Sequence, residues 1–229
     1  MSGTSSATKR VWLLRVIRGL TCLARGIYHE FNGKELSENQ NSAQVLLILG
    51  GSRTRELACA SSFSGEGFLL LSSGAATQTE LACASGINIQ RVCLDGRAVC
   101  TVTNFTSIVD DLERHSCRSL AIATSPSHRR RAFLVSCIVL GSRGIQTHSK
   151  CCSDKHDWNA DGTIAVRESN LRVCRDVARS LLWLFVGWDG GNVARFWYPE
   201  RQRQASACLQ EPLSLAIERA TVEFMTQPR

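Results

Sequence analysis

The chain has 229 residues, enough for one domain with a substantial core, and its 44% hydrophobic and 21% charged residues are ordinary for a globular protein. This composition excludes disordered, collagen-like and coiled-coil proteins. Twenty-seven Lys and Arg against twenty Asp and Glu give a net charge of +7, which favours an anionic partner without identifying it.

Residues 1–40 are predicted to form a basic amphipathic helix followed by a polar linker. One helical face carries apolar residues and the opposite face carries Arg10, Arg15, Arg18 and Arg25. The apolar residues are Trp12, Val16, Leu20, Leu23 and Ile27. The favoured interpretation is a helix that packs this stripe on the main domain. The alternative is attachment to an anionic membrane surface. The stretch is too short and too charged for a membrane span, which needs about 20 mainly apolar residues.

Residues 41–188 are predicted to form the main domain, in which short apolar runs alternate with helical segments. The expected strands are 45–49, 68–71, 88–94, 119–123 and a last one near 143–147, and the expected helices between them are 53–63, 77–85, 105–115 and about 128–140. Such alternation is typical of parallel β-α-β units, so we expect an α/β fold with a Rossmann-like, doubly wound parallel sheet of about five strands.

A loop at 150–166 precedes a strong helix over 169–186, and residues 189–229 are expected to form a C-terminal extension with one helix near 213–224. The buried side of the 169–186 helix is predicted to consist of Leu171, Cys174, Ala178, Leu181 and Phe185.

Eleven cysteines are scattered without any C-x-x-C spacing, and most stand in apolar segments. Cys59, Cys83, Cys93, Cys137 and Cys174 are therefore predicted to be reduced core residues. This pattern predicts a reducing, cytoplasmic location, peripheral to the inner membrane if the N-terminal helix attaches there.

Polar and small residues follow four of the predicted strands. In an open parallel sheet a ligand binds outside the carboxyl ends of the strands. The residues at these ends are Gly50-Gly51-Ser52-Arg53, Ser72-Ser73-Gly74, Thr101 to Asn104, and Thr124 to His128. Glycines permit close approach of backbone N–H groups, helix N-termini favour anions, and arginines hold phosphate or carboxylate. Neither G-x-G-x-x-G nor G-x-x-x-x-G-K-[ST] occurs, which excludes the ordinary dinucleotide and Walker-type sites.

The order of these motifs resembles the YdcF/SanA/ElyC family, a bacterial domain of largely unknown function found in envelope biology. The motifs are L-G-G-S-x-x-R-E from Leu49 to Glu56, S-S-G at Ser72, T-x-T-N at Thr101 and T-S-x-x-H-x-x-R-A from Thr124 to Ala132. The segment 168–187 resembles the closing helix of cyanobacterial-type members. The resemblance covers roughly residues 44–188.

This resemblance implies a Rossmann-like sheet, a role in cell-envelope or lipid-carrier metabolism, and nucleotide-like binding of the S-adenosylmethionine kind. Cys100 stands where members often carry an acidic residue. The transmembrane N-terminus of the SanA and ElyC branches is missing.

Together the positions and the resemblance predict a site for a small anionic ligand that bears phosphate or is nucleotide-like. The ligand-binding candidates are Gly50, Gly51, Arg55, Ser73, Gly74, Thr103, Asn104, Thr124, Ser125 and Arg131. His128 is the catalytic candidate, as acid, base or phosphate contact, because it begins a helix directly after a strand. Whether the protein is an enzyme stays open, and the alternative is a regulatory or interaction module at the inner membrane surface.

The sequence favours neither a metal ion nor a nucleic acid as a partner. Asp157, Asn159, Asp161 and Glu168 have the spacing of an EF-hand calcium loop, but the segment before Asp157 is not helical and no second such loop occurs. No metal is therefore predicted. No nucleic-acid partner is expected either, because the chain has no helix-turn-helix, zinc-finger or aromatic RNA-binding signature.

Overall fold

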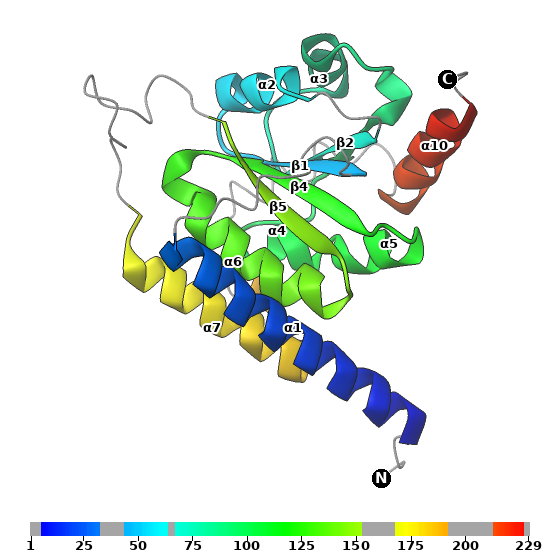
Figure 1. The fold of residues 1–229 in the computed structure, drawn as a ribbon. Helices are drawn as coiled ribbons and strands as arrows, with labels where there is room; N and C mark the ends of the chain where they lie inside the picture. Colours follow the sequence, from blue (N-terminus) through cyan, green and yellow to red (C-terminus); the bar gives the residue numbers. More distant parts are fainter. Residues whose placement is uncertain (1–5, 33–43, 64–66, 153–167, 192–212, 227–229) are drawn as a thin grey trace.

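The computed structural model describes residues 6–32, 44–63, 67–152, 168–191 and 213–226. In these residues five strands form an all-parallel sheet in the order β3-β2-β1-β4-β5 (Figure 1). The strands are β1 (Val45–Leu49), β2 (Phe68–Ser72), β3 (Val92–Asp95), β4 (Ser119–Thr124) and β5 (Gln146–Cys151). The central strand β1 pairs Ile48 with Leu71 of β2 and with Ala123 of β4. This is the predicted doubly wound, Rossmann-like α/β fold.

Helices cover both faces of the sheet, so its apolar strands are buried on each side. One face packs against α4 (Thr103–Thr106), α5 (Val109–Arg114), α6 (Pro126–Ser142) and α10 (Leu213–Thr226). There Leu47 and Ile122 of the strands meet Phe105, Val135 and Ile217 of the helices. The C-terminal helix near 213–224 was expected as part of an extension, and it packs into this same core.

The other face packs against α2 (Arg53–Ser61) and α3 (Gln78–Ser85) (Figure 1). Leu46, Ile48 and Leu69 point to this side and meet Cys59 and Leu81 of the helices. Alternate residues of each strand therefore face opposite cores, which explains why the strands read as continuous apolar runs.

An outer layer of two helices, α1 (Ser6–Asn32) and α7 (Asn170–Val186), lies on the side of α6 that faces away from the sheet (Figure 1). Glycines permit the close approach of α1. A Cβ atom at Gly19 would lie 2.9 Å from Cδ2 of Leu184, and one at Gly26 would lie 2.9 Å from Sγ of Cys137. The favoured interpretation, that this helix packs on the main domain, agrees with the structure. No described helix is long and apolar enough to cross a membrane.

The face on which α1 packs differs from the predicted one. Val16 and Leu23 contribute to the packing, but Leu20 and Ile27 are 41% and 40% exposed. Arg15, predicted to lie in water, forms an ion pair with Glu113 at 3.1 Å. The periodicity could not separate the two sides because this helix carries apolar residues on both.

The predicted phase of α7 is wrong as well. Its buried residues are Val173, Asp176, Ser180 and Leu184, whereas Leu171 is 79% and Phe185 45% exposed. Two polar residues lie on the buried side and are satisfied there by hydrogen bonds and ion pairs, so apolar periodicity selected the wrong side.

Several boundaries of strands and helices differ from the predicted ones. The strand expected at 88–94 begins at Val92, after the short 3-10 helix η2 (Ile89–Arg91), and the last strand is 146–151 instead of 143–147. The helix expected at 105–115 is the pair α4 and α5. Of the cysteines predicted in the core, Cys59, Cys93 and Cys137 are buried, but Cys83 and Cys174 are exposed.

Candidate functional site

The strand order reverses between β1 and β4, which are neighbours in the centre of the sheet. The helix after β1, α2, covers one face, and the helix after β4, α6, covers the other. In open α/β sheets the ligand binds at such a reversal, outside the carboxyl ends of the strands. The loop Gly50–Ser52 and the residues Thr124 and Ser125 therefore occupy the position where a ligand is expected.

Two helix N-termini begin at this position. Ser52 precedes α2 and Ser125 precedes α6, and neither serine side chain caps its helix with a hydrogen bond. The first N–H groups of a helix have no partner within the helix, and its dipole favours negative charge there. The Ser125 hydroxyl lies 3.1 Å from that of Ser127, and Ser125 itself is fully buried.

Among the buried polar atoms that have no hydrogen-bond partner in the part of the chain that the structure describes, one lies at the end of β4 and one in the first turn of α2. They are Oγ1 of Thr124, a residue 1% exposed, and Nε of Arg55. Arg55 also forms no ion pair with the described residues. Buried polar atoms normally have a hydrogen-bond partner, so these two atoms indicate a partner that is not part of the described chain, such as a ligand or water.

Glu56 organises the loops around this position. It is completely buried, and its Oε1 accepts a hydrogen bond from the N–H of Gly51 at 2.8 Å. Its Oε2 accepts from the N–H groups of Ala75 and Ala76, both at 2.9 Å. One carboxylate thus joins the loop after β1 to the loop after β2.

The predicted glycines serve this loop packing. A Cβ atom at Gly50 would collide with the backbone of Ser73 and Gly74, and one at Gly74 would lie 2.7 Å from Oε2 of Glu56. Ser73 itself has a left-handed backbone with φ of 52°, and its hydroxyl donates to the carbonyl of Ala98. The structure thus gives these residues a role within the protein, and their contact with a ligand stays a prediction.

Thr103 and Asn104 are likewise engaged within the protein. The Thr103 hydroxyl accepts from the N–H groups of Val99 and Cys100 at 2.9 and 2.8 Å and donates to the Cys100 carbonyl. A hydroxyl has one proton and two lone pairs, so its capacity is filled. Asn104 accepts from the Ser72 hydroxyl at 3.0 Å.

His128 and Arg131 lie together, as their spacing on one helix predicts. Nη2 of Arg131 is 3.1 Å from Nδ1 of His128, whose side chain is 44% exposed. A guanidinium can only donate, so Nδ1 must accept and the proton of the neutral ring is on Nε2. His128 therefore presents a donor, rather than a free lone pair, to its surroundings.

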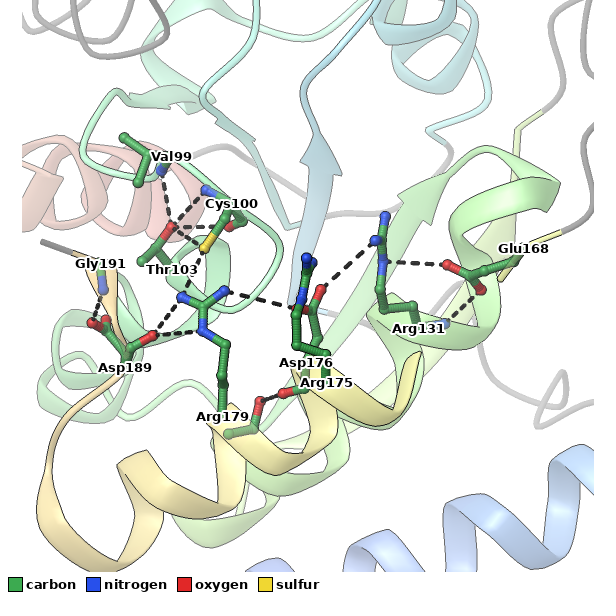
Figure 2. Close-up of polar contacts among 11 residues, drawn as sticks. Val99, Cys100, Thr103, Arg131, Glu168, Arg175, Asp176, Arg179, Asp189 and Gly191 are labelled. Carbon is green, nitrogen blue, oxygen red and sulfur yellow. Dashed lines mark hydrogen bonds and ion pairs between the residues drawn. The ribbon is translucent and has the colours of Figure 1, made fainter. Parts of the chain in front are cut away.

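Arg131 belongs to a chain of buried ion pairs that runs across α6 and α7 (Figure 2). Its Nε lies 3.2 Å from Glu168 and its Nη1 3.7 Å from Asp176. Asp176 is 1% exposed and is also reached by Arg175 and Arg179. The positive charge of Arg131 is thus already compensated inside the protein.

The chain of contacts continues from Arg179 to the loop before α4 (Figure 2). Arg179 donates to the carbonyl of Asp189 and, at 3.4 Å, to Sγ of Cys100. The Asp189 carboxylate accepts from the Thr106 hydroxyl at 2.6 Å. Cys100, the position where the resembled family often carries an acid, therefore faces a guanidinium.

Glu56 and Asp176 are the two organising residues that the sequence interpretation did not assign to the site. For Glu56 the signal is its spacing from Cys59 and Ala60, which places a carboxylate on the buried face of α2. For Asp176 it is the surrounding run of arginines at 172, 175 and 179. A buried carboxylate must find donors or cations.

The calcium interpretation rests mainly on residues outside the described ranges, since Asp157, Asn159 and Asp161 are among those not described. Its last residue, Glu168, lies beside Arg131. The described residues contain no group of three or more His, Cys, Asp or Glu side chains that could hold a metal ion.

A pair of thiols lies at the end of β5. Cys152 is hydrogen-bonded to Cys59, and its Sγ is 3.9 Å from the Ser62 hydroxyl. The bond with Cys59, assisted by Ser62 and by the charges of Lys150 and Arg55, outweighs burial and lowers the pKa of Cys152 to about 7. By contrast, burial raises the pKa of Cys117 to about 11 and that of Cys137 to about 12.

We therefore expect one thiolate to form near neutral pH in the folded protein. Its ultraviolet absorbance should rise with a midpoint at about 7, Cys152→Ser should remove this step, and Cys59→Ala should move it to higher pH. A free cysteine ionises at about 8.5, so this group stabilises the folded state above that pH and the contribution is lost as pH falls through 7. An unchanged titration in Cys152→Ser would contradict the assignment.

The chain has no significant match among protein-family models, curated proteins or solved structures.

Proposed function

We propose that the protein binds a small anionic ligand, phosphate-bearing or nucleotide-like, where α2 and α6 begin at the carboxyl ends of β1 and β4. The observation that carries this proposal is that two helices begin there without a side-chain cap, next to buried atoms of Thr124 and Arg55 that have no hydrogen-bond partner among the described residues. Helix N-termini and arginine guanidinium groups are the groups that phosphate recognition uses, and Arg55, whose charge acts on the Cys152 thiol, has no ion pair with a described carboxylate.

In this proposal Arg55 supplies the positive charge and the first turn of α2 supplies N–H donors. The start of α6 contributes fewer donors, because Pro126 has no N–H and the N–H of His128 donates to the Ser125 carbonyl at 3.0 Å. His128 adds a donor through Nε2, because its Nδ1 is held by Arg131. Arg131 orients His128 and is itself held by Glu168 and Asp176. If the ligand is a substrate, these groups suit hydrolysis or transfer at phosphate through stabilisation of negative charge.

The motif resemblance supports the same location. We propose on that basis that the chain is a member of the YdcF/SanA/ElyC family with a role in cell-envelope or lipid-carrier metabolism. Nucleotides, S-adenosylmethionine and isoprenyl phosphates are then the ligands to test first.

The test is a thermal-shift series with inorganic pyrophosphate, nucleotides, S-adenosylmethionine and isoprenyl phosphates. A ligand at a hundred times its dissociation constant adds about 2.7 kcal/mol to the free energy of unfolding. Arg55→Ala should reduce the shift, because it removes the cation proposed to bind the anion. Arg118→Ala is the matched control, since it removes an exposed arginine next to the amino end of β4. Equal shifts in both variants, or no shift with any compound, would refute the site.

A non-catalytic binding or regulatory module is the second candidate, favoured by the occupied Nδ1 of His128, which leaves the neutral ring no lone pair for base catalysis. His128→Ala distinguishes the two candidates once a ligand is known. An enzyme should lose turnover while retaining part of its affinity, whereas a binding module should change in affinity alone.

A further inference from the structure

The outer side of the α1–α7 layer carries large apolar side chains that nothing in the described structure covers. On α1 they are Leu13, Ile17, Leu20 and Ile27, exposed by 51%, 51%, 41% and 40%. On α7 and just after it they are Leu182, Phe185, Val186 and Trp188, exposed by 39%, 45%, 66% and 48%. We call these eight residues the α1–α7 surface.

The two helices present these residues side by side. Each residue of an α-helix turns by about 100°, so Leu13, Ile17, Leu20 and Ile27 form one stripe along α1, roughly 100° or more from the packing residues Gly19 and Gly26. Leu184 of α7 packs at Gly19, and the ring of Trp12 lies 6.3 Å from that of Phe185. The stripe of α1 therefore adjoins the exposed residues of α7. Single exposed apolar residues need no explanation, but a contiguous group marks an interaction site.

The exposed charged residues of α1 before Glu30 are all positive, and the acid that contacts this helix, Glu113, pairs with Arg15. Lys9, Arg10, Arg18 and Arg25 of α1 are exposed, and no acidic residue precedes Glu30 in the sequence. On α7, Arg172 and Arg175 are exposed, whereas Asp176 is buried among arginines. Two copies of the chain meeting through this surface would bring two cationic helices together, which opposes self-association.

We propose that the α1–α7 surface docks on an anionic lipid bilayer, with its apolar side chains in the headgroup boundary and Lys9 and Arg10 of α1 on the phosphates. An apolar helix face flanked by Lys and Arg is the pattern of interfacial membrane helices, in which hydrophobic burial and attraction to anionic lipid add together. The face involved is not the stripe that the sequence suggested for a membrane, because that stripe includes Val16 and Leu23, which pack on the domain.

The test is flotation of the full chain with vesicles of phosphatidylcholine alone or mixed with phosphatidylglycerol. Binding is expected only to the mixed vesicles and should fall as salt is raised. The double variant Ile17→Glu, Phe185→Glu should weaken binding by about tenfold or more, since both side chains would leave the apolar boundary. Leu215→Glu is the matched control, because Leu215 is 51% exposed on α10, away from this surface (Figure 1).

A second variant separates charge from apolar contact. Lys9→Ala with Arg10→Ala should weaken binding to the mixed vesicles and reduce its dependence on salt, because these two exposed residues lie beside the apolar stripe. The thermal midpoints should stay close to that of the unchanged protein, because all four positions are exposed. Failure to float with mixed vesicles, equal flotation of the double glutamate variant, or a dimer in sedimentation equilibrium that this variant dissociates would each overturn the proposal.

Discussion

Replacing Glu56 by alanine is expected to lower the free energy of unfolding by about 3–5 kcal/mol. The substitution leaves the N–H groups of Gly51, Ala75 and Ala76 without their acceptor. Each unsatisfied buried donor costs about 1–3 kcal/mol, and partial access of water to the loops would reduce the total. Urea unfolding followed by circular dichroism measures the loss.

Glu56→Gln sharpens this prediction. Glutamine keeps the shape but offers one acceptor oxygen, and its NH₂ group must face at least one backbone N–H, so most of the loss should remain. Glu80→Gln is the control, because Glu80 accepts from the N–H of Thr77 at an exposed helix start, where a glutamine oxygen can accept the same bond. This change removes only the exposed ion pair with Arg53, which contributes about 0–1 kcal/mol. If Glu56→Gln destabilised the protein no more than Glu80→Gln, the carboxylate would not be what joins the two loops.

The same variants connect stability with binding. Glu56 fixes the N–H of Gly51 in the loop between β1 and α2, where the anion is proposed to lie. Displacement of this loop in the Glu56 variants should therefore weaken ligand binding, even though the Glu56 carboxylate accepts its hydrogen bonds from backbone N–H groups and does not contact the ligand in this proposal. Arg55 and Glu56 thus have separate proposed roles, one toward the ligand and one toward the loops, although they are adjacent in sequence.

The fold could be predicted from the sequence, because the strands of a parallel sheet are buried on both faces and appear as continuous apolar runs. Val45–Leu49 and Phe68–Ser72 illustrate this. The buried faces of α1 and α7 were harder to predict, because apolar periodicity identifies a buried face only when the other face is polar. Phe185 is exposed while Ser180 is buried, and only tertiary contacts decide this.

The location of the candidate site could be predicted from the sequence. The sequence did not show which of its residues hold the loops together and which could contact a ligand. The carboxyl ends of the strands follow from the fold class, so Gly50, Thr124 and Ser125 could be placed there. Which polar side chain faces a ligand depends on hydrogen bonds between distant segments. The hydrogen-bonding capacity of the Thr103 hydroxyl is used within its own loop, and the carboxylate of Glu56 is bonded to two loops. No local sequence pattern distinguishes these residues from Thr124, whose hydroxyl has no described partner.

Asp176→Asn is expected to destabilise the protein by about 3–5 kcal/mol, because it removes the negative charge between buried arginines. The side chains of Arg131 and Arg179 are only 10% and 20% exposed and lie 3.7 and 3.8 Å from the carboxylate. The change takes a carboxylate from both arginines, so that Arg131 keeps Glu168 and Arg179 keeps only the Asp189 carbonyl and Sγ of Cys100 among the contacts described above. Salt screens such buried pairs weakly. The loss should therefore persist at high salt, as measured by urea unfolding.

Asp110→Asn is the matched control, since Asp110 pairs with Arg143 at 3.0 Å but its own side chain is 63% exposed. Exposed pairs contribute about 0–1 kcal/mol, and that small loss should shrink as salt is raised. The double variant Arg131→Met, Asp176→Asn should lose less than the sum of the two single variants, because each change removes one partner of an ion pair that the other has already broken. Strict additivity, or equal losses in Asp176→Asn and Asp110→Asn, would show that the arginines of α6 and α7 do not depend on Asp176, and the orientation of His128 through Arg131 would then need another source.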